Sequence, residues 1–156
     1  MDESIRARAK RAFWERHANP ASGWSRTLTL PALLYAVYHR RWRLLVATVA
    51  FTLLNPVLFS PPDDADAWMT KVVLAERQWR ESGDRLGALQ ALNVGNGLAT
   101  LYAVYAAYRR DVGGATVAGA VAMTLKLAFV DALVRRYGDE VEWPAAPPYS
   151  SDRVTE

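Results

Sequence analysis

The chain lacks cysteine altogether and contains only two histidines among 156 residues. The absence of cysteine excludes disulfides, thiol catalysis and cysteine-ligated zinc or iron–sulfur sites. His17 and His39 lie too far apart to form an H-x-x-x-H metal-binding motif, so we expect neither a metal nor another cofactor. With 51% apolar residues, the composition is too apolar for a disordered chain.

The length corresponds to one domain, which we place at residues 1–143. Residues 144–156 form a polar, proline-containing tail that we expect to be disordered. The net charge is +3, and the mean hydropathy of -0.07 is typical of a soluble protein. This average is misleading because the charges are clustered and the apolar residues occur in long runs.

Four stretches carry few or no charges: 27–38, 44–62, 86–108 and 112–134. A hydrocarbon core about 30 Å thick needs about 20 apolar helical residues, which the third stretch supplies by itself. The second stretch approaches this length if Trp42 anchors its end. The fourth stretch reaches it if the bilayer accommodates the charged side chains of Lys126 and Asp131. The first is the shortest and needs tilting or local thinning of the bilayer. The pattern predicts an all-α bundle of four transmembrane helices.

A soluble four-helix bundle is the alternative. A soluble bundle helix should show a polar face at the helical period, whereas residues 98–108 (LATLYAVYAAY) show none. Tryptophans lie outside the apolar runs or at their ends, as in interfacial aromatic belts. They are Trp14, Trp24, Trp42, Trp68, Trp79 and Trp143. We therefore expect the lipid bilayer to be the principal partner.

Basic turns at Arg41 and at Arg109-Arg110 divide the four segments into two hairpins. Between the hairpins, residues 63–82 are predicted to form an amphipathic helix, capped by Asp63 or Asp64 and ended by Ser82-Gly83. We place this helix flat on the membrane or against the bundle. Its apolar stripe comprises Trp68, Val72, Ala75 and Trp79.

The N-terminal residues form a basic amphipathic pattern suited to an anionic membrane surface, although a solvated charged tail is equally compatible. The first 26 residues lack the apolar region of a secretory signal, so the membrane segments themselves are expected to direct insertion. The apolar face of this N-terminal helix comprises Ile5, Ala9, Ala12 and Phe13.

Small residues recur at four-residue spacing in the third and fourth segments, a pattern that allows close helix packing in lipid. We interpret the rows as the seam between these two segments; a homodimer face, and hence a homo-oligomer, is the alternative. The rows are Ala99, Ala103 and Ala107, and Gly114, Ala118 and Ala122.

Polar side chains within apolar segments mark candidate sites in membrane proteins. At about 1.5 Å per residue, these side chains lie about 20–32 Å from the hairpin turns and so form one layer. In one interpretation Lys126 snorkels to the interface and the amides join helices. In the other, the layer is a polar pocket for an ion or small ligand. The layer comprises Asn55, Gln90, Asn93, Asn96, Lys126 and Asp131.

Residues 16–26 read RHANPASGWSR, which resembles the R-H-A-N-P-x-S-x-W-x-R signature of a family of small prokaryotic integral-membrane proteins carried as a domain of unknown function. Residues 55–62, 68–79 and 126–131 resemble its N-P-x-x-F-x-P-P, W…L-x-E-R-x-W and K-L-x-F-x-D elements. The chain departs from the family at Ala21 and Ala128, where an aromatic residue is frequent. The resemblance covers roughly residues 13–140 and implies a multi-pass membrane fold without an assigned activity.

The signature also has a physical interpretation. Asn19-Pro20 predicts a turn, and Ser22 is expected to cap the following helix. Trp24 is suited to anchor at the interface, while Arg16 and Arg26 are suited to meet lipid phosphate. Three signature residues and two residues of the connecting helix fall on the same side of the membrane as the polar layer and extend the candidate ligand site. They are Arg16, His17, Asn19, Glu76 and Arg77.

Lysine and arginine are more numerous on the side of the termini than in the two hairpin turns. The positive-inside rule then predicts that both termini of this cell-membrane protein are cytoplasmic.

We expect a non-enzymatic scaffold or assembly protein. The alternatives are binding or transport of a small ligand or ion through the polar layer, and a lipid-headgroup enzyme with His17 or Glu76 as base. No catalytic motif supports the enzyme, and no convincing inverted repeat supports a transporter. Nucleic-acid binding is not expected because the basic residues mostly flank apolar runs.

Overall fold

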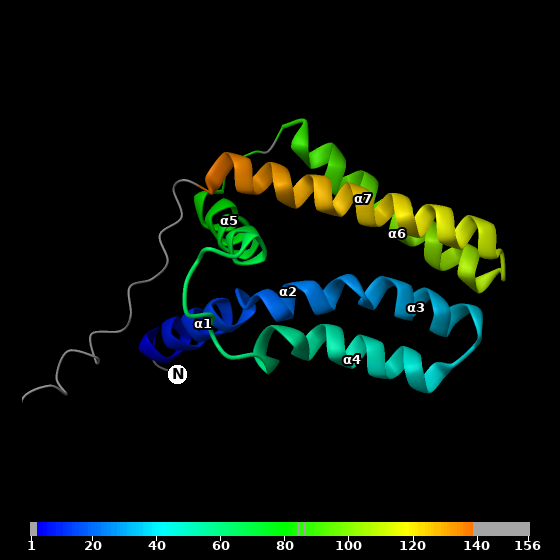
Figure 1. Ribbon diagram of the computed structural model, residues 1–156, viewed down its shortest axis with the longest axis horizontal. Coiled ribbons are helices and arrows are strands. Elements are labelled where there is room, and N and C mark those ends of the chain that lie inside the picture. Colours follow the sequence, from blue (N-terminus) through cyan, green and yellow to red (C-terminus); the bar gives the residue numbers. More distant parts are fainter. Residues whose placement is uncertain (1–2, 84, 86, 139–156) are drawn as a thin grey trace, which may run out of the picture.

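The computed structural model describes residues 3–83, 85 and 87–138, which form seven helices and no strand (Figure 1). The all-α fold expected from the sequence is confirmed, and the tail at 144–156 lies outside the described residues. The helices are α1 (Glu3–His17), α2 (Pro20–Thr27), α3 (Thr29–Tyr38), α4 (Trp42–Leu58), α5 (Trp68–Ser82), α6 (Leu89–Tyr108) and α7 (Val112–Tyr137).

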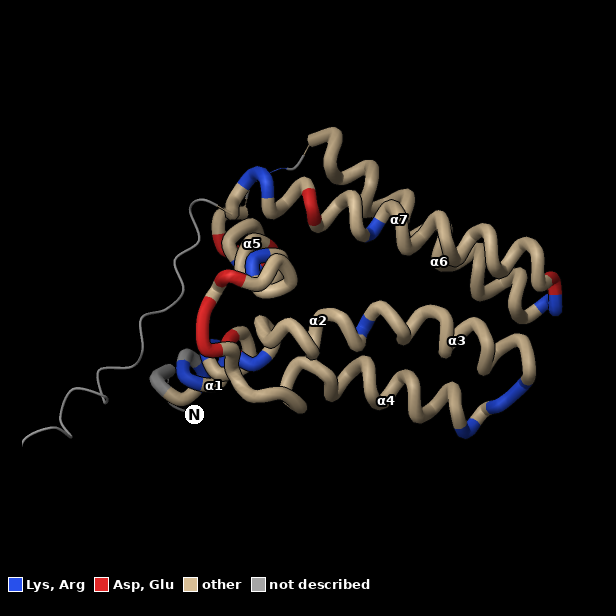
Figure 2. The backbone as a smooth tube through the Cα atoms, viewed as in Figure 1, with Lys and Arg blue, Asp and Glu red and all other residues tan. Residues whose placement is uncertain are grey.

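Two long hairpins lie side by side. The helices α1, α2 and α3 follow one another along one rod, and α4 returns beside it, while α6 and α7 form the second hairpin (Figure 1). Both hairpin turns lie at the same end, and α1 and α5 lie at the opposite end. Charged residues gather at these two ends, and the intervening helical stretches carry few of them (Figure 2).

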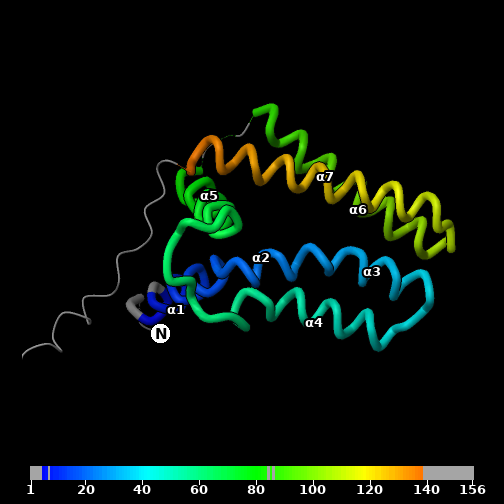
Figure 3. The backbone as a smooth tube through the Cα atoms, viewed as in Figure 1, coloured from blue at the N-terminus to red at the C-terminus, as the bar shows by residue number. Residues whose placement is uncertain are grey.

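The first apolar segment is not one continuous helix. The helix α2 ends at Thr27 and α3 begins at Thr29, although the two continue in nearly the same direction (Figure 3). Pro31 has no N–H to donate to the carbonyl of Thr27, so the regular ladder is interrupted there. The hydroxyl of Thr29 instead donates to the carbonyl of Arg26 at 2.7 Å, which satisfies one of the carbonyls at this break.

The two hairpin turns have the same construction. Arg40 and Arg110 both adopt the left-handed conformation, with φ of 55° and 62°. In each turn the next N–H donates five residues back, from Arg41 to Ala36 and from Asp111 to Ala106, as in a Schellman motif. The matching sequences are YAVYHRR and YAAYRRD, so the hairpins share a local repeat at their turns.

The connecting helix α5 packs between the hairpins at the end opposite the turns. Met69, Val72 and Ala75 form a buried cluster with Phe129 and Leu133 of α7, and Trp68 and Trp79 pack against it. The predicted apolar stripe and the end at Gly83, with φ of 69°, are therefore confirmed. A second buried cluster joins the other face of α5 to the start of the first hairpin through Ala18, Val73 and Leu74.

The start of α5 differs from the prediction. The helix begins at Trp68 rather than at 63, and its N-cap residue is Ala67, which offers no side-chain cap. Asp64 accepts a hydrogen bond from the N–H of Asp66 at 3.0 Å. This local Asx turn uses the carboxylate that was expected to cap the helix.

The helices α6 and α7 lie against each other through small side chains. Ala103, Ala107, Ala118 and Ala122 are buried, whereas Ala99 and Gly114 are partly buried. A Cβ added at Gly114 would lie 3.3 Å from the Cβ of Ala106, so little room remains there. Both predicted small-residue rows thus lie on these two packed helices within one molecule.

Among the described helices, α7 alone has both the length and the hydropathy to cross a membrane. The helix α4 is apolar but has only 17 residues. The helix α6 has 20 residues, but its three amides and three tyrosines lower its hydropathy. The hydropathy of α6 therefore does not support this third segment as a span by itself, and the four-span arrangement remains a prediction.

The repeated turns provide a matched pair of substitutions. A left-handed residue that is not glycine costs roughly 1–2 kcal/mol, so Arg110→Gly should raise the free energy of unfolding by about 1 kcal/mol. Arg40 donates to the carbonyl of Tyr108 at 2.7 Å, and its guanidinium lies 4.2 Å from the centre of that ring. Arg40→Gly loses these contacts and should give no gain. Thermal unfolding in detergent measures both variants, and equal stabilisation would contradict the prediction.

Candidate ligand site between the hairpins

The signature segment forms the joint between α1 and α2. Asn19 is the N-cap of α2: its side-chain oxygen accepts from the N–H of Ala21 at 2.8 Å, and Pro20 occupies the first helical position. The expectation that Ser22 caps this helix is therefore wrong. Ser22 lies inside α2 and is fully buried.

Asn55 connects this joint to α4. Its side chain has no exposed surface, accepts from the Ser22 hydroxyl at 2.7 Å and donates to the Ser25 oxygen at 2.8 Å. Asn55 therefore fastens α4 to α2, and its amide belongs to the packing of the first hairpin. A buried amide satisfied in this way specifies one register between two helices.

Two other signature residues satisfy carbonyls in the last turn of α4 and just beyond it, where the helix itself offers no donor. Arg16 donates to the carbonyl of Val57 at 3.1 Å, and Asn19 donates to that of Ser60 at 2.9 Å. Thr70 of α5 similarly donates to the carbonyl of Ala18 at 2.9 Å. The joint thus holds together the ends of α1, α4 and α5.

His17 is buried beside Arg26. An arginine side chain only donates hydrogen bonds, so His17 Nε2 accepts from Arg26 Nη1 at 3.0 Å, while Nδ1 is buried without a hydrogen-bond partner among the described residues. Burial, and next the positive charge of Arg26, lower the pKa of His17 from 6.5 to about 4; Glu76 acts in the opposite direction. The ring is therefore neutral at pH 7.

A cavity of about 390 Å³, which we call the polar chamber, lies between the hairpins on the side of α5. Residues from all helices except α1 line it. Its polar side chains are Arg26, Thr27, Thr29, Thr52, Glu76, Asn96, Thr100 and Lys126, and its apolar wall includes Leu30, Leu33, Met69, Val72, Met123 and Val130.

The charges of the polar chamber favour an anion. Arg26 and Lys126 contribute two cations, whereas Glu76 is the single lining acid. Glu76 is already paired with Arg80, whose guanidinium lies 2.6 Å from the carboxylate. Lys126 is exposed, and its ammonium lies 5.5 Å from the centre of the Phe129 ring.

The chamber collects only part of the predicted site. Glu76, Asn96 and Lys126 line it, and His17 lies directly behind Arg26. Other predicted residues lie elsewhere: Gln90 is exposed and Asn93 is half-buried, and neither lines a described cavity. Both residues precede Asn96 along α6, nearer to the start of that helix.

Two predicted charged residues instead pair within their own helices. Asp131 accepts from Arg135 at 2.8 Å, and Arg77 donates to Glu81 at 3.2 Å. Sequence reasoning placed Arg26 at the lipid surface and did not single out the lining threonines. The position of Arg26 within the signature was the available signal for its role in the site. The direction of the Arg26 side chain, however, depends on the break between α2 and α3 after Thr27.

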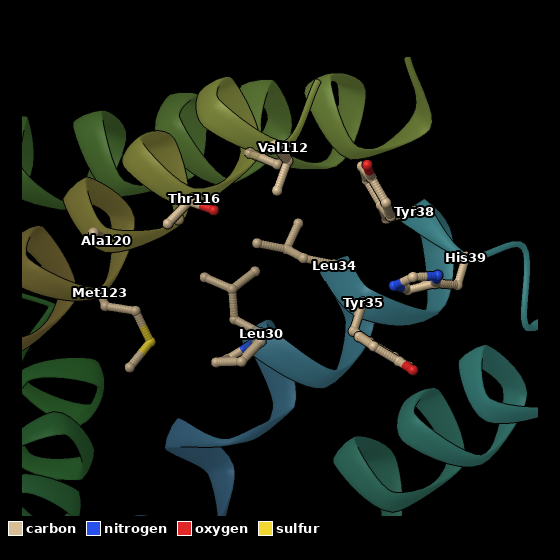
Figure 4. Close-up of a pocket in the computed structure, with 12 residues that line it drawn as sticks. Leu30, Leu34, Tyr35, Tyr38, His39, Val112, Thr116, Ala120 and Met123 are labelled. Atoms are coloured by element: carbon tan, nitrogen blue, oxygen red, sulfur yellow. The ribbon is translucent and has the colours of Figure 1, made fainter. Parts of the chain in front are cut away.

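A second cavity of about 390 Å³, the apolar chamber, lies between α3 and α7 on the side of the turns (Figure 4). Its lining residues include no Asp, Glu, Lys or Arg. Leu30 and Met123 line both chambers, so the two cavities adjoin. Among the described residues, no group of three or more His, Asp or Glu side chains is placed to hold a metal ion.

The lowered pKa of His17 predicts a pH-dependent stability. The unfolded chain binds a proton near pH 6.5 and the folded chain near pH 4, so stability present above pH 6.5 is lost as the pH falls between these values. The shift corresponds to about 3 kcal/mol. His17→Gln retains an acceptor for Arg26 but does not titrate, and it should show a smaller loss. Thermal unfolding from pH 7.5 to 4.5 measures this; equal losses in both proteins would contradict it.

Comparisons with known proteins identify a family without an activity. Searches of the curated proteins and of the solved structures give no match. Residues 6–153 match a family described as "Family of unknown function (DUF6653)", in agreement with the expected membership of an uncharacterised family. Because the match covers nearly the whole chain, the protein belongs to the family of unknown function DUF6653.

Proposed function

We propose that the chain is a multi-pass membrane protein that binds a small anionic ligand in the polar chamber. The observation that carries the proposal is that Arg26 and Lys126, from different hairpins, both line one cavity whose single acid is already paired with Arg80. A cavity of about 390 Å³ is within the usual range for small-molecule sites. Asn96 and the threonines supply further hydrogen-bonding groups.

The distribution of exposed apolar residues supports the membrane location. Soluble monomers rarely expose contiguous apolar patches beyond a few hundred Å². Here large apolar side chains are exposed on several helices, along the stretches that lie between the charged ends. Examples are Val46, Leu53 and Leu54 on α4, Leu98, Leu101 and Tyr105 on α6, and Val117 and Val121 on α7.

In the arrangement we propose, the α2–α3 rod, α4, α6 and α7 cross the bilayer, and α1 and α5 lie at its cytoplasmic surface. The length and apolar character of α7 support one span directly. The shorter rods require local thinning of the bilayer. The larger number of lysines and arginines on the side of the termini supports the cytoplasmic placement.

Ligand binding has more support than the other two functions. The small-residue rows expected to assemble a scaffold lie between α6 and α7 of one molecule, where they are largely used in internal packing. A lipid-headgroup enzyme would use His17 or Glu76 as base. The Nε2 lone pair of His17 is occupied by Arg26, and Glu76 is paired with Arg80, so neither group is arranged to take a proton from a substrate.

The absence of native cysteine allows a direct test of the membrane arrangement. Single cysteines at Asp63, before α5, and at Arg109, in the second turn, should lie on opposite sides of the membrane. A membrane-impermeant maleimide added to intact cells should label Arg109→Cys, and it should label Asp63→Cys only after permeabilisation. Labelling of both positions from outside would contradict the four-span arrangement, and the reverse pattern would invert its orientation.

Ligand binding is tested with glycerol phosphate, a soluble phosphate monoester, in uncharged detergent. The Tm of the wild-type protein should rise with the concentration of glycerol phosphate. Lys126→Met should lower the apparent affinity taken from this response at least about tenfold, because the chamber then loses one of its two cations. Arg135→Met removes an exposed cation outside the chamber and serves as the matched control. Equal responses in Lys126→Met and wild type, or no response in wild type, would contradict the proposal.

A further inference from the structure

The two chambers differ in chemistry but adjoin one another. Leu30 of α3 and Met123 of α7 line both, and each chamber measures about 390 Å³. In Figure 4, Leu30 and Met123 lie at one end of the apolar chamber, while Tyr38 and His39 lie at the other. The path between the hairpins therefore passes from charged and amide groups near α5 to apolar side chains near the turns.

Small side chains on α7 create the apolar chamber. Gly119 permits close approach of α3, because an added Cβ would lie 2.9 Å from Leu34 Cδ1. Ala115 and Ala120 leave space opposite Leu30 and Leu34. Thr116 and the rings of Tyr35, Tyr38 and His39 provide the polar groups of this chamber, so most of its wall suits hydrocarbon rather than a soluble anion.

We propose that the ligand is a phospholipid with a net negative charge: its phosphate headgroup occupies the polar chamber and one acyl chain occupies the apolar chamber between α3 and α7. This inference rests on the proposed function and specifies the ligand class. The phosphate meets Arg26 and Lys126, whose charges exceed that of the single acid, Glu76. The acyl chain passes between Leu30 and Met123 toward the turns.

The direction of this lipid agrees with the charge pattern of the fold. The polar chamber lies toward α5, which marks one charged end, and the apolar chamber extends into the stretch where α3 and α7 carry no charged side chain. A lipid of the leaflet on the α5 side has its headgroup near that end and its chains directed toward the bilayer centre. The lipid therefore enters without reversing its orientation.

The experiment compares glycerol phosphate with dioctanoylphosphatidylglycerol and dioctanoylphosphatidylcholine, using Tm and native mass spectrometry of the full chain in uncharged detergent. Ala120→Phe fills the apolar chamber without changing its charge. Val117→Phe is the matched control, because Val117 is 66% exposed on the same helix and lines neither chamber. A response of Ala120→Phe to glycerol phosphate like that of the wild type shows that the variant is folded.

We expect the phosphatidylglycerol to bind wild type and Val117→Phe with similar affinity. Its affinity for Ala120→Phe and for Lys126→Met should be at least about tenfold lower. The phosphatidylcholine, which has the same chains and no net charge, should bind wild type more weakly. If glycerol phosphate stabilises the protein but the lipid binds wild type and Ala120→Phe equally, the lipid inference is overturned and the anion site stands. If Lys126→Met weakens neither ligand, both proposals are overturned.

Discussion

The hydrogen bonds between the α1–α2 joint and the end of α4 determine the geometry of the whole charged end. A helix that ends in an apolar setting leaves carbonyls without donors, and each unsatisfied group is costly. Arg16 and Asn19 supply donors to the end of α4, and the buried amide of Asn55 fixes its register against α2. The same joint places Arg26 against His17, and thereby sets one wall of the polar chamber.

Sequence patterns predicted the local structure well where short-range rules decide it. The two basic turns, the apolar stripe of α5 and its glycine end follow from spacing and turn chemistry, and the structure has all three. The predicted start of α5 is wrong because Asp64 forms its own turn. The break after Thr27 was not predicted, because a proline within an apolar run leaves the hydrophobic pattern unchanged while it removes one N–H from the helical ladder. Neither error involves the hydrophobic pattern.

The candidate site was only partly predictable, because depth along a helix does not fix the direction of a side chain. Counting from the turns placed Asn55, Asn96 and Lys126 at similar heights, yet Asn55 turns toward α2, whereas Asn96 and Lys126 line the chamber. Those directions depend on how the hairpins pack, and that packing depends on α5. The position of α5 is a tertiary property. Its amphipathic stripe is compatible both with a helix on the membrane surface and with a helix packed against the bundle.

The helix α5 is held in place differently from the four rods around it. In the proposed arrangement the four rods are held by lipid, while α5 is held by side-chain contacts with Phe129 and Leu133 on one face and Ala18 on the other. Glu76, Met69 and Val72 of α5 form part of the wall of the polar chamber. In the proposed arrangement the part of the chamber wall that α5 contributes lies toward the aqueous phase, and the part that the rods contribute lies within the bilayer.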